Sequence, residues 1–117
     1  MYRMDHAYKR HRYWLPPGQE LSKLPSEYFR EHIYTTFQDD WIAFKMVEHV
    51  NHQRLLWAND FPHSDSTWPW SQEMLDEHAA NLTDDQAKDI LCNNTAELYE
   101  IDVTALPIGG DSLAATL

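Results

Sequence analysis

Asp60, His63 and Asp65 lie close together in the stretch Asp60-Phe-Pro-His-Ser-Asp65. A carboxylate such as that of Asp60 can bind a divalent metal ion or act as a general base, because its oxygen lone pairs attract cations and protons. His63 can add a ring nitrogen to the same chemistry. Both residues also have a structural alternative. An aspartate in a turn accepts hydrogen bonds from backbone N–H groups, and a loop histidine often only packs or faces water.

The other candidate ligands form weaker patterns. His49 and His52 are three positions apart near the end of a predicted helix, a spacing that permits metal binding, although we expect both to face solvent. Cys92 is the only cysteine, which excludes an internal disulfide and a cysteine zinc cluster. Trp68 and Trp70 follow the Asp60 loop, and we expect them to pack against the protein rather than to stack on a substrate.

Two predicted strands determine where Asp60 lies in the fold. Residues 32–37 are rich in β-branched and aromatic side chains, and residues 54–59 contain the continuous apolar run Leu-Leu-Trp-Ala. A continuous run is typical of a parallel strand covered on both faces. A helix over 41–48, capped by Asp39 or Asp40, connects the two strands. Asp60 therefore follows the carboxyl end of a parallel strand, where the active sites of such sheets assemble.

Helices account for most of the remaining chain. The predicted order is strand, helix, strand, helix, helix, with the two strands parallel and adjacent. The Thr83-Asp-Asp-Gln86 sequence fits a capping box, in which the Thr and Gln side chains satisfy free N–H groups at a helix start. The predicted helical segments are 4–14, 25–30, 71–81 with Ser71 as its cap, and 83–100.

Two parallel strands cannot form a stable sheet by themselves. The sequence therefore predicts an α/β chain that depends on further strands and is marginally stable or self-associating when isolated. We expect Trp41, Phe44, Leu55 and Trp57 to need a partner that covers them.

Composition excludes several classes of protein. The 117 residues fit one domain and carry a net charge of −10, from 9 Lys and Arg against 19 Asp and Glu. Nucleic acids and anionic membranes are poor partners for such a chain. The apolar runs are too short for a transmembrane helix, and residues 1–6 contain no apolar signal-peptide core. We therefore expect a cytoplasmic protein.

Four segments of the chain carry a family resemblance. They are Pro25–Arg30, Ile33–Asp40, Leu56–Pro69 and Asn93–Tyr99. Together they resemble the C-terminal part of the amidohydrolase-related proteins, which are metal-dependent (β/α)8-barrel hydrolases and decarboxylases grouped with aminocarboxymuconate-semialdehyde decarboxylase. The resemblance extends from about residue 4 to residue 102, and its most specific part is the Asp-aromatic-Pro-His loop followed by Asp-Ser-Thr-Trp-Pro.

The resemblance implies a fold and a site. The fold is an α/β fragment, the C-terminal part of a (β/α)8 TIM barrel with two parallel strands and about four to five helices. Residues 1–103 would form the last two β/α units and the terminal helix, and residues 104–117 a loose tail. Asp60 would be the metal-associated aspartate that ends the eighth strand, and His63 would orient the loop or contact the substrate.

The resemblance also implies a reaction class. It is metal-dependent hydrolysis or nonoxidative decarboxylation of a small-molecule substrate, with a divalent metal, expected to be zinc, bound only in the complete barrel. The family's His-x-His pair occurs nowhere in this sequence, so we expect the chain to be inactive alone. Its partners would be the missing barrel segments or further copies of itself. The alternatives are a truncated non-catalytic fragment and a protein-interaction module that uses the Trp-rich loop.

Overall fold

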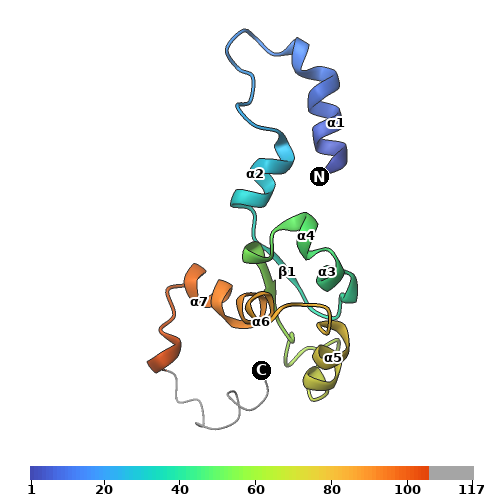
Figure 1. Ribbon diagram of the computed structural model, residues 1–117, viewed down its shortest axis with the longest axis vertical. Helices are drawn as coiled ribbons and strands as arrows, with labels where there is room; N and C mark the ends of the chain where they lie inside the picture. The colour runs from blue at the N-terminus through green and yellow to red at the C-terminus, as the bar shows by residue number, and fades with distance from the viewer. Residues whose placement is uncertain (106–117) are drawn as a thin grey trace. The chain divides into compact units, whose positions relative to one another are not determined.

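The computed structural model describes residues 1–105, which fall into two compact units: residues 1–34 and the residues from Thr35 onward (Figure 1). Thr104 and Ala105, the start of the predicted tail, belong to a short 3₁₀ turn, η4 (Val103–Ala105). The remainder of that predicted tail lies outside the described residues. Among residues 1–105, no helix is both long and apolar enough to cross a membrane.

Two helices form the first unit. They are α1 (Tyr2–His11), followed by the 3₁₀ turn η1 (Arg12–Trp14), and α2 (Pro25–His32). The predicted single helix over 4–14 is therefore wrong in its last turn. Leu15 is extended, as expected for a residue that precedes proline, and the α-helix ends before it. Pro25 occupies the first position of α2, where its missing N–H costs nothing.

Polar contacts join α1 to α2. The Asp5 carboxylate accepts hydrogen bonds from the Ser26 backbone N–H at 2.8 Å and from the Ser26 hydroxyl at 2.7 Å. These bonds hold the pKa of Asp5 below its usual 3.8, the Ser26 hydroxyl having the largest effect. The Tyr8 hydroxyl accepts a further bond from the Leu21 N–H at 2.8 Å. Ser26 is the one buried residue among residues 1–34, so this unit has no hydrophobic core.

A parallel sheet forms the centre of the second unit. Strands β1 (Thr35–Phe37) and β2 (Leu55–Trp57) pair in parallel, with Thr35 opposite Leu55 and Phe37 opposite Trp57. The predicted pairing and direction are confirmed. Both strands are shorter than predicted: His32 belongs to α2 and Arg54 to the 3₁₀ turn η2 (His52–Arg54), and residues 33–34 and 58–59 belong to no helix or strand.

The connection between the strands is helical but interrupted. It consists of α3 (Trp41–Lys45) and α4 (Val47–Val50), separated at Met46, in place of the single predicted helix. Asp40 is the residue before α3, yet its side chain forms no capping hydrogen bond. The predicted aspartate cap is therefore wrong at this position.

Five buried apolar residues form the core of the second unit: Phe37, Phe44, Val47, Leu55 and Ile90. The rings of Phe37 and Phe44 meet edge to face at 4.9 Å. Phe44 and Leu55 are covered within the chain, so the expectation that they need an outside partner is wrong. Trp57 is half-buried, and Trp41 remains 55% exposed.

The helices after β2 are α5 (Ser71–His78), α6 (Asp84–Lys88), the π-helical turn η3 (Asp89–Asn93) and α7 (Asn94–Leu98). The capping box before α6 is confirmed, with the Thr83 hydroxyl accepting from the Gln86 N–H at 3.3 Å and Gln86 Oε1 accepting from the Thr83 N–H at 3.1 Å. The Ser71 cap is wrong, because Trp70 precedes α5 and Ser71 is its first residue. Ile90, within η3, is fully buried in the core.

Candidate functional site

Asp60 lies just beyond the carboxyl end of β2, where the sequence predicts it. Its φ of 60° is in the left-handed region, which aspartate tolerates better than most residues. Its Oδ1 is 2.9 Å from Nδ1 of His63, and its carbonyl accepts the His63 backbone N–H at 2.9 Å. The structure thus brings the two predicted site residues into direct contact. Both are accessible, since the Asp60 side chain is 40% exposed and that of His63 is 74% exposed.

The neighbouring Asn59 organises the loop that carries this pair. Its carbonyl accepts hydrogen bonds from the Ser66 hydroxyl at 2.7 Å and from the Thr67 N–H at 3.1 Å. Its side-chain oxygen accepts the Phe61 N–H at 3.1 Å. Ser66 Oγ in turn accepts the Trp68 N–H at 3.1 Å. The backbone on both sides of Asp60 is therefore fixed by side chains of the loop itself.

Contacts with the end of β1 hold the same loop from the other strand. The Gln38 side-chain amide donates to the Asp65 carbonyl. The Gln38 carbonyl accepts the indole N–H of Trp57 at 3.0 Å. The Phe37 carbonyl accepts the Ala58 N–H at 3.1 Å, which extends the strand pairing toward the loop. The carboxyl ends of β1 and β2 thus form one polar region with Asp60 at its edge.

Aromatic side chains in this loop remain accessible. The Phe61 and Trp68 rings meet edge to face at 5.3 Å, and the peptide bonds that precede Pro62 and Pro69 are cis. Trp68 is 57% exposed and Trp70 is 66% exposed. The packing expected of the tryptophans is seen for Trp68, whose ring contacts that of Phe61, although more than half of each tryptophan side chain faces solvent.

The Asp60–His63 pair does not form a metal site by itself. One carboxylate oxygen and one imidazole nitrogen are donors that suit zinc, but a catalytic zinc needs three protein ligands. In the part of the chain that the structure describes, no group of three or more His, Cys, Asp and Glu side chains is placed to hold a metal ion. A metal site that includes Asp60 would require donors from outside residues 1–105.

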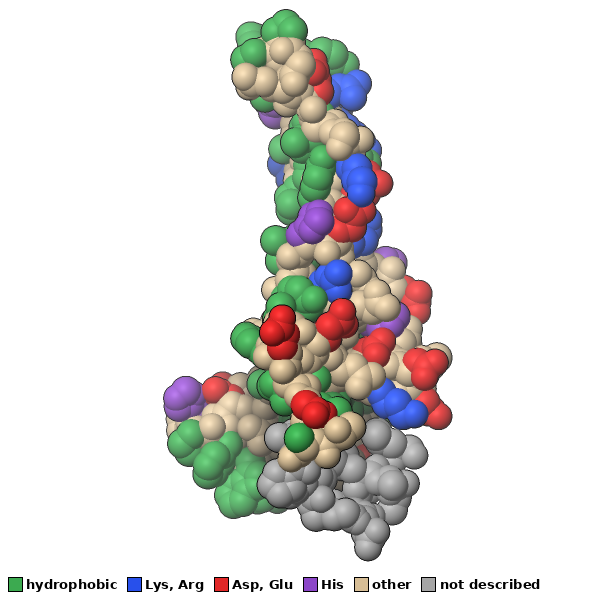
Figure 2. Space-filling view, turned by 90° about the vertical axis from the view of Figure 1, so that its left-hand side faces the viewer, with side chains coloured by type: hydrophobic (Ala, Val, Ile, Leu, Met, Phe, Trp, Pro, Cys, Tyr) green, Lys and Arg blue, Asp and Glu red, His purple; other side chains and the backbone are tan. Residues whose placement is uncertain are grey.

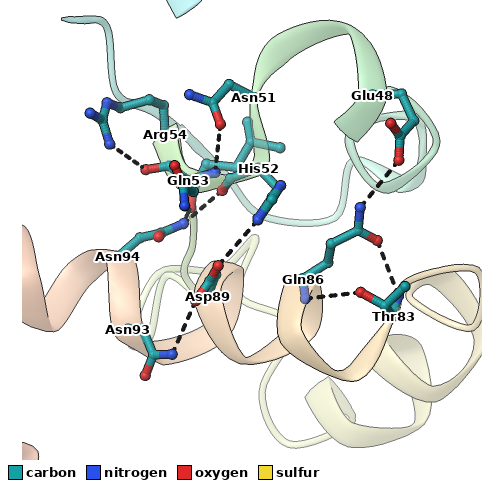
Figure 3. A network of polar contacts seen from close by, with 11 residues as sticks. Glu48, Asn51, His52, Gln53, Arg54, Thr83, Gln86, Asp89, Asn93 and Asn94 are labelled. Carbon is teal, nitrogen blue, oxygen red and sulfur yellow. Dashed lines mark hydrogen bonds and ion pairs between the residues drawn. The ribbon is translucent and has the colours of Figure 1, made fainter. Parts of the chain in front are cut away.

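A second polar cluster lies at the opposite, amino end of β2 (Figure 3). His52 Nε2 is 3.2 Å from Asp89 Oδ2, and the Asn93 side-chain amide donates to Asp89 Oδ1 at 3.1 Å. His52 therefore does not simply face solvent, as the sequence suggested, because η3 presents Asp89 to it. His49 is exposed, in agreement with the prediction. A cavity of about 490 Å³ lies beside this cluster, lined in part by His52, Asp89 and Asn93.

Sequence reasoning did not assign roles to Asp89 or Asn94. Asn94 is buried, and its side-chain amide donates to the His52 carbonyl at 2.7 Å and to the Leu55 carbonyl at 2.9 Å (Figure 3). It thereby fixes the start of β2, whose other end leads to Asp60. The sequence feature that could have indicated a role for Asn94 is its polar side chain among the apolar positions of the last predicted helix.

Comparison with known families gives the identity of the domain. The family model described as Amidohydrolase matches residues 3–101, nearly the whole chain. The chain belongs to the amidohydrolase family. A search of curated proteins found no match. Members of the amidohydrolase family are generally metal-dependent, and the resemblance seen in the sequence is confirmed at the level of the family.

The amidohydrolase match covers the Asp60 loop, both strands and α7. It supports a hydrolase-family chain. The two parallel strands and the surrounding helices are consistent with part of the mixed α/β fold of that family.

Proposed function

We propose that this chain supplies the last two β/α units of a metal-dependent amidohydrolase barrel, with Asp60 as its reactive carboxylate. The observation that carries the proposal is the position of Asp60, three residues beyond the carboxyl end of β2, in a loop fixed by Asn59 and Ser66. Active sites of parallel barrels assemble at the carboxyl ends of the strands. The amidohydrolase family match supports the same reading.

Asp60 and His63 have separate roles in this proposal. The Asp60 carboxylate accepts a proton or serves as one ligand of a metal ion whose other donors come from barrel segments outside these 117 residues. His63 is a positioning residue, since its Nδ1 contacts Oδ1 of Asp60 at 2.9 Å and so fixes the direction of the carboxylate. The exposed loop gives His63 a second role, contact with a small-molecule substrate.

The reaction is hydrolysis or nonoxidative decarboxylation of a small organic substrate. Family membership supports hydrolysis, and the Asp-Phe-Pro-His loop supports the decarboxylase-like subgroup. We expect zinc as the metal of the complete barrel. The cytoplasmic location expected from the sequence stays a prediction.

The isolated chain is expected to be inactive. Its two adjacent donors fall short of a zinc site, and zinc affinity depends on several ligands converging on one ion. Calorimetric titration of the purified chain with zinc should therefore show weak binding that His63→Ala changes little. Tight binding of one zinc ion per chain would contradict this part of the proposal.

The role of Asp60 is tested by substitution in a complete amidohydrolase that carries the same loop. The change equivalent to Asp60→Asn should lower kcat by about 10²–10⁴-fold or more, since the amide has nearly the same shape but cannot take up the proton. The change equivalent to Asp76→Asn, an exposed residue of α5 outside the loop, is the control and should leave kcat nearly unchanged. If the Asp60 variant kept most of its activity, Asp60 would be a turn residue and this chain a non-catalytic fragment.

A further inference from the structure

The two units of the chain carry charge of opposite sign. Residues 1–34 contain six Lys and Arg and four Asp and Glu, a net charge of +2. Residues 35–117 contain three Lys and Arg and fifteen Asp and Glu, a net charge of −12. Such a separation favours contact between the first unit of one molecule and the second unit of another.

One face of α1 combines the basic charge with exposed aromatic area. Arg3, Arg10 and Trp14 lie at positions i, i+7 and i+11, so they share one side of the helix and its 3₁₀ extension. All three are exposed, and Trp14 is 84% exposed. The contacts with α2 and the segment before it are made by other residues of α1, Asp5 and Tyr8. Figure 2 shows hydrophobic and basic side chains along the N-terminal unit.

The matching surface lies on α5. Trp70, Glu73 and Glu77 lie at positions i, i+3 and i+7, so they also share one side of a helix, and all three are exposed. Next to it is a hollow of about 370 Å³ that is lined by Trp41, Lys45, Glu77 and His78. This surface offers two carboxylates and a recess with an aromatic wall, the counterpart of two guanidinium groups and an exposed indole. The lysine of the recess, Lys45, already donates to Asn81 Oδ1 at 2.7 Å.

We propose that two copies of this chain associate by exchange, with the α1 face of each copy (Arg3, Arg10, Trp14) docked on the α5 face of the other (Trp70, Glu73, Glu77). Reciprocal exchange gives a closed pair with two identical contacts. Burial of the two exposed tryptophans supplies apolar area, and the paired charges fix the register of the contact. This inference does not depend on the proposed reaction.

The first test is sedimentation of the full 117-residue chain. At 50 mM NaCl we expect a dimer that dissociates on dilution, and at 0.5 M NaCl a higher dissociation constant, because salt screens the paired charges. A net charge of −10 on each copy would by itself give the opposite salt dependence, as would a purely apolar contact. A monomer at all concentrations would overturn the proposal.

Charge reversal identifies the surfaces. Arg3→Glu/Arg10→Glu and Glu73→Lys/Glu77→Lys should each weaken the dimer by tenfold or more. An equimolar mixture of the two variants should form a heterodimer, because each of its two contacts again joins opposite charges. Lys88→Glu, on α6, is the control and should leave the dissociation constant unchanged within a factor of about two.

Circular dichroism of each variant shows whether it is folded. The mixing experiment provides a second check, because it requires both variants to form a dimer again. Two variants that are monomeric only because they are unfolded would not recover a dimer on mixing. Trp14→Ala should weaken the dimer at both salt concentrations alike. The proposed exchange would be overturned if two folded variants formed no heterodimer on mixing. It would also be overturned if neither charge reversal changed the dissociation constant of the dimer.

Discussion

A single side chain, Asn94, connects the last helix to the start of the strand that leads to Asp60. It is buried, and its amide donates two hydrogen bonds to carbonyls at the amino end of β2. Replacement by alanine leaves the His52 and Leu55 carbonyls without these donors. Because an unsatisfied buried polar group costs about 1–3 kcal/mol, Asn94→Ala should lower the free energy of unfolding by about 2 kcal/mol or more.

Urea denaturation measures this loss, and the adjacent residue provides the control. Asn93 is exposed, and its side-chain amide donates a hydrogen bond to Asp89. Asn93→Ala should therefore lower the free energy of unfolding by less than about 1 kcal/mol. Equal losses for the two variants would show that Asn94 does not hold β2 in place.

Contacts between single residues were predictable from the sequence where the two residues are close along the chain. The contact between Asp60 and His63 joins residues three positions apart, so their proximity is built into the loop. The pair of His52 and Asp89 joins η2 to η3, 37 positions later, so it depends on how the last helical segment packs against the start of β2. No local pattern in the sequence reports such a long-range contact, and Asp89 was therefore not predicted as the partner of His52.

At the scale of elements, the start of α6 depends on the capping box at Thr83 and Gln86. Thr83→Ala removes the acceptor for the Gln86 N–H and should lower the free energy of unfolding by about 1 kcal/mol. Thr83→Ser retains the hydroxyl and should behave nearly like the parent protein. Thermal and urea unfolding would provide the comparison, and an equal effect of both substitutions would contradict the capping role.

The contact between α1 and α2 should depend on pH. Because hydrogen bonds from Ser26 lower the pKa of Asp5 in the folded state, this contact contributes stability at pH values above the unfolded pKa, close to 3.8. The contribution is lost as the pH falls below 3.8 toward the lowered pKa. NMR titration of the Asp5 carboxyl group should therefore give a midpoint below 3.8.

Ser26→Ala tests the cause of this shift. It removes the hydroxyl donor, which has the largest effect, and should raise the Asp5 midpoint toward its usual value. Ser22→Ala removes a hydroxyl that contacts Tyr28 in the same unit and should leave the midpoint unchanged. An Asp5 midpoint that Ser26→Ala does not move would rule out the hydroxyl as its cause.

The elements themselves were largely predictable, and their ends were not. The periodicity of apolar residues and the Thr83 capping box indicated the helices, and the β-branched and continuous apolar runs indicated β1 and β2. The apolar pattern gives no sign of the interruption at Met46, since Phe44 and Val47 on either side of it are both buried in the core. Ser71 has the side chain of a cap, but the helix begins at Ser71 itself.

For the whole molecule, stability should reside in the second unit. All five core residues lie beyond residue 34, whereas Ser26 is the one buried residue of the first unit. A shortened chain of residues 35–117 should therefore still unfold cooperatively in urea, with a free energy of unfolding within about 1 kcal/mol of the parent value. Non-cooperative unfolding of the shortened chain would show that residues 1–34 stabilise the core.

The same core explains which whole-molecule expectation failed. Two paired strands suggested that apolar residues on β2 and α3 would lack cover, yet Leu55 on β2 and Phe44 on α3 are both buried, while Trp41 stays exposed. Helices that follow in the sequence supply that cover, including η3 from residues far along the chain. A pattern read strand by strand does not show which distant helix folds back onto the sheet.

The π-helical turn η3 also limits how the length of this chain can change during evolution. A π turn holds one residue more than an α-helical turn, so loss of one residue between Asp89 and Asn93 would restore regular helix. Because the wide turn absorbs the extra residue, Asn94 and every later side chain would keep their direction around the helix axis. A deletion in α6, which has no extra residue, would instead rotate all later side chains by about 100° and turn Asn94 away from the carbonyls of β2. Single-residue deletions should therefore be tolerated inside η3 and eliminated in α6.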